Sequence, residues 1–115
     1  MRLVIGNNIF AHLGQPVVND VAPFIDPATN RTMVPLRVIA EGLGAEVDFC
    51  DETRTVTIVQ NGTELTLTID VPLPGDLGTP VIVNERTFVP ARYVMELFDA
   101  TVRWDEVAQA VYVYR

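Results

Sequence analysis

Residues 31–43 read Arg-Thr-Met-Val-Pro-Leu-Arg-Val-Ile-Ala-Glu-Gly-Leu, and residues 86–98 read Arg-Thr-Phe-Val-Pro-Ala-Arg-Tyr-Val-Met-Glu-Leu-Phe. The two stretches align without a gap and share the pattern R-T-x-V-P-x-R-x-x-x-E. An internal repeat of this kind indicates two copies of one supersecondary unit. The sequence therefore predicts a single domain, residues 1–115, built from repeats of about 1–60 and 61–115.

Each copy of the motif predicts a short strand followed by a helix of about two turns. Pro35 and Pro90 suit the first helical position, where the missing N–H is no loss. Apolar residues then recur at helical spacing, and these predict one buried stripe per helix: Leu36, Ile39, Ala40 and Leu43, then Ala91, Val94, Met95 and Phe98. Gly44 can end the first helix in the left-handed conformation, which Asp99 adopts less readily at the same place in the second copy.

Each helix also carries an arginine and a glutamate four residues apart, Arg37 with Glu41 and Arg92 with Glu96. The cation lies toward the helix start, an order that opposes the helix dipole on an exposed surface. We therefore expect structural ion pairs in which each arginine also reaches a carboxylate and main-chain carbonyls of neighbouring strands. The alternative is an anion-binding arginine, which the repetition does not favour.

The rest of the chain reads as short strands and turns. Arg2 to Ile5 is a predicted strand, and prolines at 16, 23 and 27 keep the next region, with its Asn19-Asp20 turn, out of helix. Residues 55–60 and 63–69 flank Asn61-Gly62, a strong hairpin signal. Residues 71–80 form the loop between the repeats. We expect the buried faces to include Val47, Phe49, Val56, Ile58, Leu65, Leu67 and Ile69.

These elements predict an α+β fold in which one or two curved antiparallel sheets pack around two short helices. The net charge is −7, and all eight basic residues are arginines, four of them inside the repeated motif. Such a surface argues against nucleic acid and anionic lipid as partners. The sequence has no apolar run long enough for a membrane span and no signal peptide, although a leader could have been removed.

Residues for catalysis or metal binding are sparse. His12 is the only histidine, so a copper site built from imidazoles is excluded by count, and we expect no metal or cofactor. Glu46, Asp48, Asp51 and Glu52 lack calcium-loop spacing and read as solvated turn charges. Cys50 allows no internal disulfide and has no histidine nearby in sequence, while the chain has no serine.

The repeated motif, with Leu43 to Val47 after the first copy and Trp104-Asp105 after the second, resembles the copper amine oxidase N-terminal-like domain, also called a stalk domain. The resemblance covers nearly the whole chain, although Phe98-Asp99 and Phe49-Cys50 depart from the family pattern. It implies a non-catalytic bacterial module, secreted or at the cell surface, often beside cell-wall-binding or enzymatic domains. It also implies an antiparallel sheet packed around helix.

Two functional hypotheses follow. The first is a non-catalytic surface module that spaces domains or binds a protein, a cell-wall polymer or a second copy of itself. The second is a small glycan-binding or hydrolase-like domain that uses exposed aromatic and acidic residues. Val56 and Ile58 match Val111 and Val113 as inward positions. Between them Thr57 and Val59 give way to Tyr112 and Tyr114, which we expect to form a partner surface on the last strand.

Overall fold

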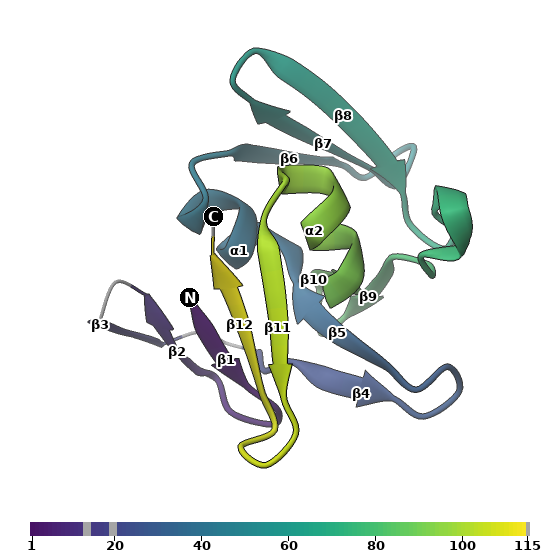
Figure 1. Ribbon diagram of the computed structural model, residues 1–115. Helices are drawn as coiled ribbons and strands as arrows, with labels where there is room; N and C mark the ends of the chain where they lie inside the picture. Colours follow the sequence, from purple (N-terminus) through teal and green to yellow (C-terminus); the bar gives the residue numbers. More distant parts are fainter. Residues whose placement is uncertain (13–14, 19–20, 115) are drawn as a thin grey trace.

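The structure is a computed structural model that describes residues 1–12, 15–18 and 21–114. Three antiparallel sheets, rather than the one or two expected, surround two short helices (Figure 1). The predicted α+β class is confirmed. Within the described residues, no helix is long and apolar enough to cross a membrane.

We name the sheets A, B and C. Sheet A has the strand order β11-β12-β1-β2-β3, sheet B the order β4-β5-β10-β9, and sheet C the order β6-β7-β8. The strands of sheet A are β11 (Thr101–Asp105), β12 (Ala110–Tyr114), β1 (Arg2–Val4), β2 (Ile9–His12) and β3 (Gln15–Val18). Those of sheet B are β4 (Phe24–Asp26), β5 (Arg31–Pro35), β10 (Arg86–Pro90) and β9 (Val81–Val83). Those of sheet C are β6 (Glu46–Cys50), β7 (Thr55–Gln60) and β8 (Thr63–Thr68).

The two repeats have equivalent elements. The first runs β4, β5, α1 (Leu36–Gly42), β6 and β7, and the second runs β9, β10, α2 (Ala91–Phe98), β11 and β12. Strands β5 and β10 pair antiparallel at the centre of sheet B. Both helices pack on these central strands, and sheets A and C close around the helices from two sides (Figure 1). The fold therefore has an internal two-fold relationship between its halves.

Each half is completed by a strand from the other repeat. Strand β8, which belongs to the second repeat in sequence, pairs with β7 of the first. Strand β1, at the start of the first repeat, pairs with β12 at the end of the second. The register is equivalent, because Leu3 lies opposite Val111 and Leu67 lies opposite Val56. The predicted division near residue 60 thus falls between two hydrogen-bonded strands, and the repeats exchange their first strands.

Main-chain hydrogen bonds after the exchanged strands repeat this symmetry. The Ile5 N–H donates to the Gln109 carbonyl at 2.8 Å, and the Ile69 N–H donates to the Arg54 carbonyl at 2.9 Å. One residue further on, the Gly6 and Asp70 N–H groups donate to the carbonyls of Pro23 and Pro80, at 3.0 and 2.9 Å. The chain segments that follow the two exchanged strands are therefore fixed in the same way.

The helices begin one residue later than predicted. Pro35 and Pro90 are the last residues of their strands and precede the helices with extended ψ angles of 121° and 137°. Each proline is still paired across the β5–β10 ladder, which requires that extended backbone. The helix ends agree better with prediction. Gly44 has a φ of 87°, and Asp99 takes the left-handed conformation at the equivalent position with a φ of 51°.

Most predicted core positions are buried, including Leu36, Ile39 and Ala40 of α1 and Ala91, Val94 and Phe98 of α2. Leu43 is half-buried, and the side chain of Met95 is not among those described. The hairpin β7–β8 turns at Asn61-Gly62 with positive φ at both residues, as predicted. Two burial predictions are wrong, although both residues lie on the inner faces of their strands, Leu65 opposite Ile58 and Phe49 opposite Val56. Leu65 is 41% exposed and Phe49 is 38% exposed, and each lines a surface groove.

The region before β4 forms an extra hairpin. Residues 9–12 and 15–18 pair as β2 and β3 and extend sheet A to five strands. The predicted turn at Asn19 and Asp20 lies outside the described residues. Pro16 lies in β3, the edge strand of the sheet, where a missing N–H breaks no ladder.

Candidate interaction surface

The surface of interest is the face of sheet A that points away from the helices, called here the outer face of sheet A. Side chains alternate along β12, so Val111 and Val113 point into the core, where both are buried. Tyr112 and Tyr114 point to the other side. The inward prediction for Val56, Ile58, Val111 and Val113 is confirmed, since all four are 1% exposed.

Tyr112 lies between two arginines from the neighbouring strands. In the register of sheet A, Arg2 of β1 and Arg103 of β11 both lie opposite Tyr112. The guanidinium carbons are 5.9 Å (Arg2) and 5.1 Å (Arg103) from the centre of the tyrosine ring. Arg2 Nε also donates a hydrogen bond to the Tyr112 hydroxyl at 3.2 Å. Cation–π contacts at exposed sites contribute about 0.5–1 kcal/mol each, so the ring and both cations hold one another in place.

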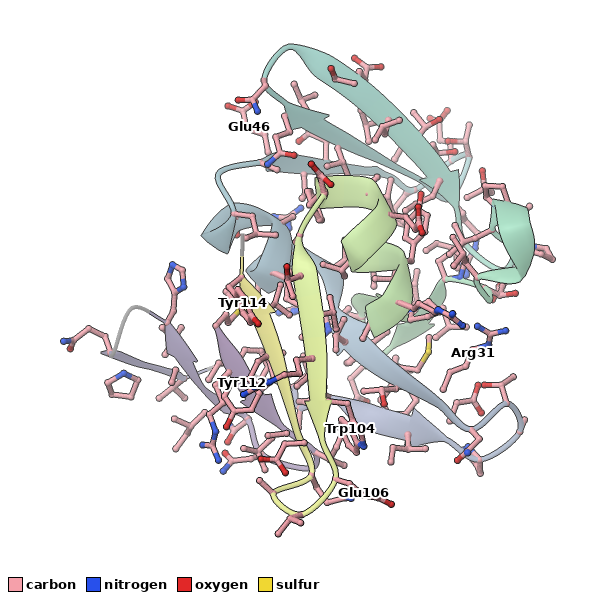
Figure 2. All side chains as sticks on the ribbon, in the orientation of Figure 1. Arg31, Glu46, Trp104, Glu106, Tyr112 and Tyr114 are labelled. Carbon is pink, nitrogen blue, oxygen red and sulfur yellow. The ribbon has the colours of Figure 1, made fainter. Side chains whose placement is uncertain are left out.

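Tyr114 is the more accessible of the two rings, with 47% of its surface exposed, whereas Tyr112 is half-buried. Tyr114 lies opposite Thr101 on β11. Both labelled tyrosines lie along β12 in Figure 2. Strand β1 lies beside β12 in the same sheet, so the N-terminal segment does not bury both rings. The proposal that Tyr112 and Tyr114 form a partner surface therefore stays a prediction.

An apolar strip continues this face on the extra hairpin. Ile9 lies opposite Val18, and the two are 48% and 73% exposed. Both share the outer face with Arg2, because Arg2 lies opposite Ala11, two residues along β2 from Ile9. Neither the apolar strip nor the placement of Arg2 and Arg103 beside Tyr112 was predicted from the sequence. Their position depends on the pairing of β1 with β12 and β2, between segments far apart in the chain.

The structure corrects the expectation that each helix carries a structural ion pair. Arg37, Glu41, Arg92 and Glu96 are all exposed, and within the described part of the chain neither pair is bridged. An ion pair does join Arg54 and Asp70 on the surface, with 3.3 Å between the guanidinium nitrogen and the carboxylate oxygen. One part of the expectation holds: Arg37 Nη2 donates to the Val47 carbonyl of β6 at 3.2 Å. Arg37 thus links α1 to sheet C through a single exposed hydrogen bond.

Arg37 and Glu41 border a groove of about 420 Å³ between α1, β6 and the β9–β10 turn. Phe49, Glu85 and Arg86 also line it. A second groove, of about 500 Å³, lies between the β7–β8 hairpin and the end of α2, where it is lined by Leu65 and Asp99. Both grooves are lined by threonine and carboxylate side chains, but within the described residues no hydrogen bond joins the two kinds of group, so we assign no reaction to them.

His12 lies against α1, next to Met1 and Gly42. Its Nδ1 atom is buried and has no hydrogen-bond partner among the described residues. Within those residues, no group of three or more His, Cys, Asp or Glu side chains is placed to hold a metal ion. A single imidazole does not supply the nitrogen donors of a copper site, so the residues present do not fit one.

Cys50 and the acidic residues lie on the surface. A hydrogen bond with the Thr53 side chain lowers the pKa of the Cys50 thiol, but the residue is exposed on β6. Glu46, Asp48, Asp51 and Glu52 are all exposed. Asp48 lies opposite Thr57, and Glu46 lies opposite Val59, so these two acids project from the outer face of sheet C.

The exposed aromatic residues do not form one platform. Trp104 is 40% exposed, but it lies opposite Val111 and so belongs to the inner side of sheet A. The tyrosines project from the other side of the same sheet (Figure 2). This arrangement does not favour a glycan site built from Trp104 together with Tyr112 and Tyr114.

A family model described as the copper amine oxidase N-terminal domain matches two stretches of the chain, residues 13–73 and 77–115. No curated protein and no solved structure gives a significant match. The domain described by that family is a non-catalytic accessory domain.

Proposed function

We propose that this chain, which belongs to the copper amine oxidase N-terminal domain family, is a non-catalytic module at a bacterial cell surface or outside the cell. Its role is to space neighbouring domains and to contact a protein or a cell-wall polymer. The outer face of sheet A is the contact surface.

One observation supports this assignment above others. Equivalent inward positions of the two repeats carry similar aliphatic residues, whereas the outward positions differ, with Tyr112 and Tyr114 in place of Thr57 and Val59. Core packing explains the inward residues in both repeats. It does not explain a tyrosine pair on the outer face with an arginine on each side of Tyr112. Tyrosine and arginine are the residue types enriched at protein interfaces.

The experiment is a pelleting assay with purified peptidoglycan, comparing the wild type with the double variant Tyr112→Ser, Tyr114→Ser. The matched control is Thr57→Ser, Val59→Ser, which changes the equivalent positions of sheet C. We expect both variants to stay folded, although the tyrosine variant loses the cation–π contacts of Tyr112 and should melt somewhat lower. Only the tyrosine variant should lose binding, by tenfold or more. Equal retention of binding by all three proteins would contradict the assignment of this face.

The second hypothesis is a glycan-binding domain. A titration with soluble peptidoglycan fragments, followed by Trp104 fluorescence, distinguishes it from the first. Because Trp104 lies on the other side of sheet A from the tyrosines, binding at the tyrosine face should leave its emission nearly unchanged. A saturable change in emission, retained in the tyrosine variant, would favour the second hypothesis instead.

A further inference from the structure

We propose that the outer face of sheet A docks onto the outer face of sheet C of a second copy of this chain, so that the module associates head to tail. The proposal rests on the proposed function, because it uses the same contact surface and names its partner. The evidence is the distribution of charge over two faces that the internal two-fold makes equivalent.

Equivalent rows across the two sheets carry opposite charge. In sheet A the central row is Arg103, Tyr112 and Arg2, from three adjacent strands. In sheet C the equivalent row is Asp48, Thr57 and Thr66. An aspartate thus stands where the other face has an arginine, and a small threonine stands where the other face has the tyrosine.

The next row adds two more acids to sheet C. Glu46 of β6 and Glu64 of β8 both lie opposite Val59, one on each side. Glu46, Asp48 and Glu64 are exposed, as are Arg2 and Arg103. The outer face of sheet C is therefore acidic around Thr57 and Val59, and its small central side chains leave room for a tyrosine ring. Charge matched across a contact fixes partner choice and register more than affinity.

One copy cannot bring its own two faces together. Figure 2 shows Glu46 near the top of the view, on sheet C, and Tyr114 and Tyr112 lower in the view, on sheet A. The contact therefore joins different patches on the two copies. Such a heterologous contact leaves one face of each kind free after every addition, so association continues beyond a dimer unless a ring closes. At physiological salt the screening length is about 8 Å, which weakens the repulsion between two acidic molecules but spares charges in contact.

The experiment is sedimentation velocity of the whole chain over a concentration series, in about 0.15 M and about 1 M salt. We expect the weight-average mass to rise with concentration beyond that of a dimer at the lower salt, and to fall toward the monomer at the higher salt. Arg103→Glu and Asp48→Arg should each abolish the rise, because each sets like charges against each other where Arg103 of one copy would meet Asp48 of the next. An equimolar mixture of the two variants should restore it, since each variant then meets a complementary face on the other.

The control is Glu106→Arg, which changes the net charge as Asp48→Arg does but lies in the exposed β11–β12 turn, away from both outer faces. It should associate as the wild type does, and all variants should stay folded, although Arg103→Glu loses its cation–π contact with Tyr112 and should melt slightly lower. A wild type that stays monomeric, or a mixture that fails to restore association, overturns the second copy as partner. If the wild type stays monomeric but binds poly-glutamate, and Arg103→Glu does not, the partner of this face is an acidic polymer and not a second copy. Peptidoglycan binding through Tyr112 and Tyr114 stands or falls separately, in the pelleting assay.

Discussion

Val34 and Val89 lie directly opposite each other on β5 and β10, and both side chains are fully buried. They are the same position of the repeated motif. On one side of this pair Phe88 lies opposite Pro35, and on the other Pro90 lies opposite Met33. Exchanging the repeats converts each of these flanking pairs into the other. The internal two-fold therefore passes through the Val34–Val89 pair, and the two repeats meet as the subunits of a symmetric dimer do.

Because the two valines are equivalent and equally buried, Val34→Ala and Val89→Ala should destabilise the fold by similar amounts. Removing two buried methyl groups costs about 2 kcal/mol. Cross-strand neighbours interact directly, so the double variant should depart from the sum of the single variants. Urea unfolding of the three variants measures this. A half-buried outer-face residue, as in Val59→Ala, serves as the control and should cost less. Strict additivity would show that the two side chains are not energetically coupled.

Arg37→Ala should reduce the free energy of unfolding by about 1 kcal/mol or less. The guanidinium is exposed and donates one hydrogen bond, to the Val47 carbonyl, and net contributions of such bonds are of this size. The structural ion pair expected from the sequence would, if buried, have made the cost a few kcal/mol. Arg37→Lys is the matched variant. A loss of several kcal/mol in denaturant unfolding would revive the buried-pair interpretation.

Local features of this fold were predictable from sequence, and long-range pairings were not. The repeat identified the strand–helix units, and Asn61-Gly62 identified the hairpin, because these signals lie within a few residues. The exchange of β1 and β8 has no such signal, since Arg2 and Tyr112 pair across almost the whole chain. The alternation that makes Leu3 equivalent to Leu67 is too short to establish a partner.

The same limit explains the candidate surface. Tyr112 and Tyr114 were identified as outward residues because the buried positions between and around them repeat. Arg2 and Arg103 become part of the surface only through the register of three strands. The ion-pair prediction failed for a different reason. The order of charges on the helix was used to infer that each arginine is bound by neighbouring strands, whereas Arg37 and Glu41 are exposed and border a surface groove.

Purified protein should bind no stoichiometric copper and show no amine oxidase activity. The chain has one histidine, His12, whose ring is packed against α1 beside Gly42, and it supplies no second imidazole. Metal analysis after dialysis against Cu²⁺ and a peroxide-coupled amine oxidase assay test this, with His12→Gln as the matched variant. One equivalent of copper held at micromolar affinity or tighter, and lost in His12→Gln, would contradict the prediction.

Stability should fall in alkaline solution partly through Tyr93. Burial raises the pKa of the Tyr93 phenol above its ordinary value of about 10. The folded state thus favours the protonated form more than the unfolded state does. The stability that this difference contributes is fully present below about pH 10 and is lost as the pH rises through the pKa of the folded state. Unfolding free energies of wild type and Tyr93→Phe should converge or cross above pH 10. An identical decline in both proteins would assign the effect to other groups.

The strand exchange makes a residue near the start of the chain as important as one in its middle. Leu3 is fully buried opposite Val111, and Leu67 is buried opposite Val56 at the equivalent place in sheet C. Terminal residues usually tolerate change, because few contacts hold them. Here Leu3→Ala should destabilise the fold about as much as Leu67→Ala, by about 3 kcal/mol each, since both leave a cavity under a paired strand. Leu65→Ala, in the exposed part of β8, is the control and should cost under about 1 kcal/mol. Chemical denaturation followed by Trp104 fluorescence reports all three, and a negligible cost for Leu3→Ala alone would mean that β1 does not complete the second half of the fold.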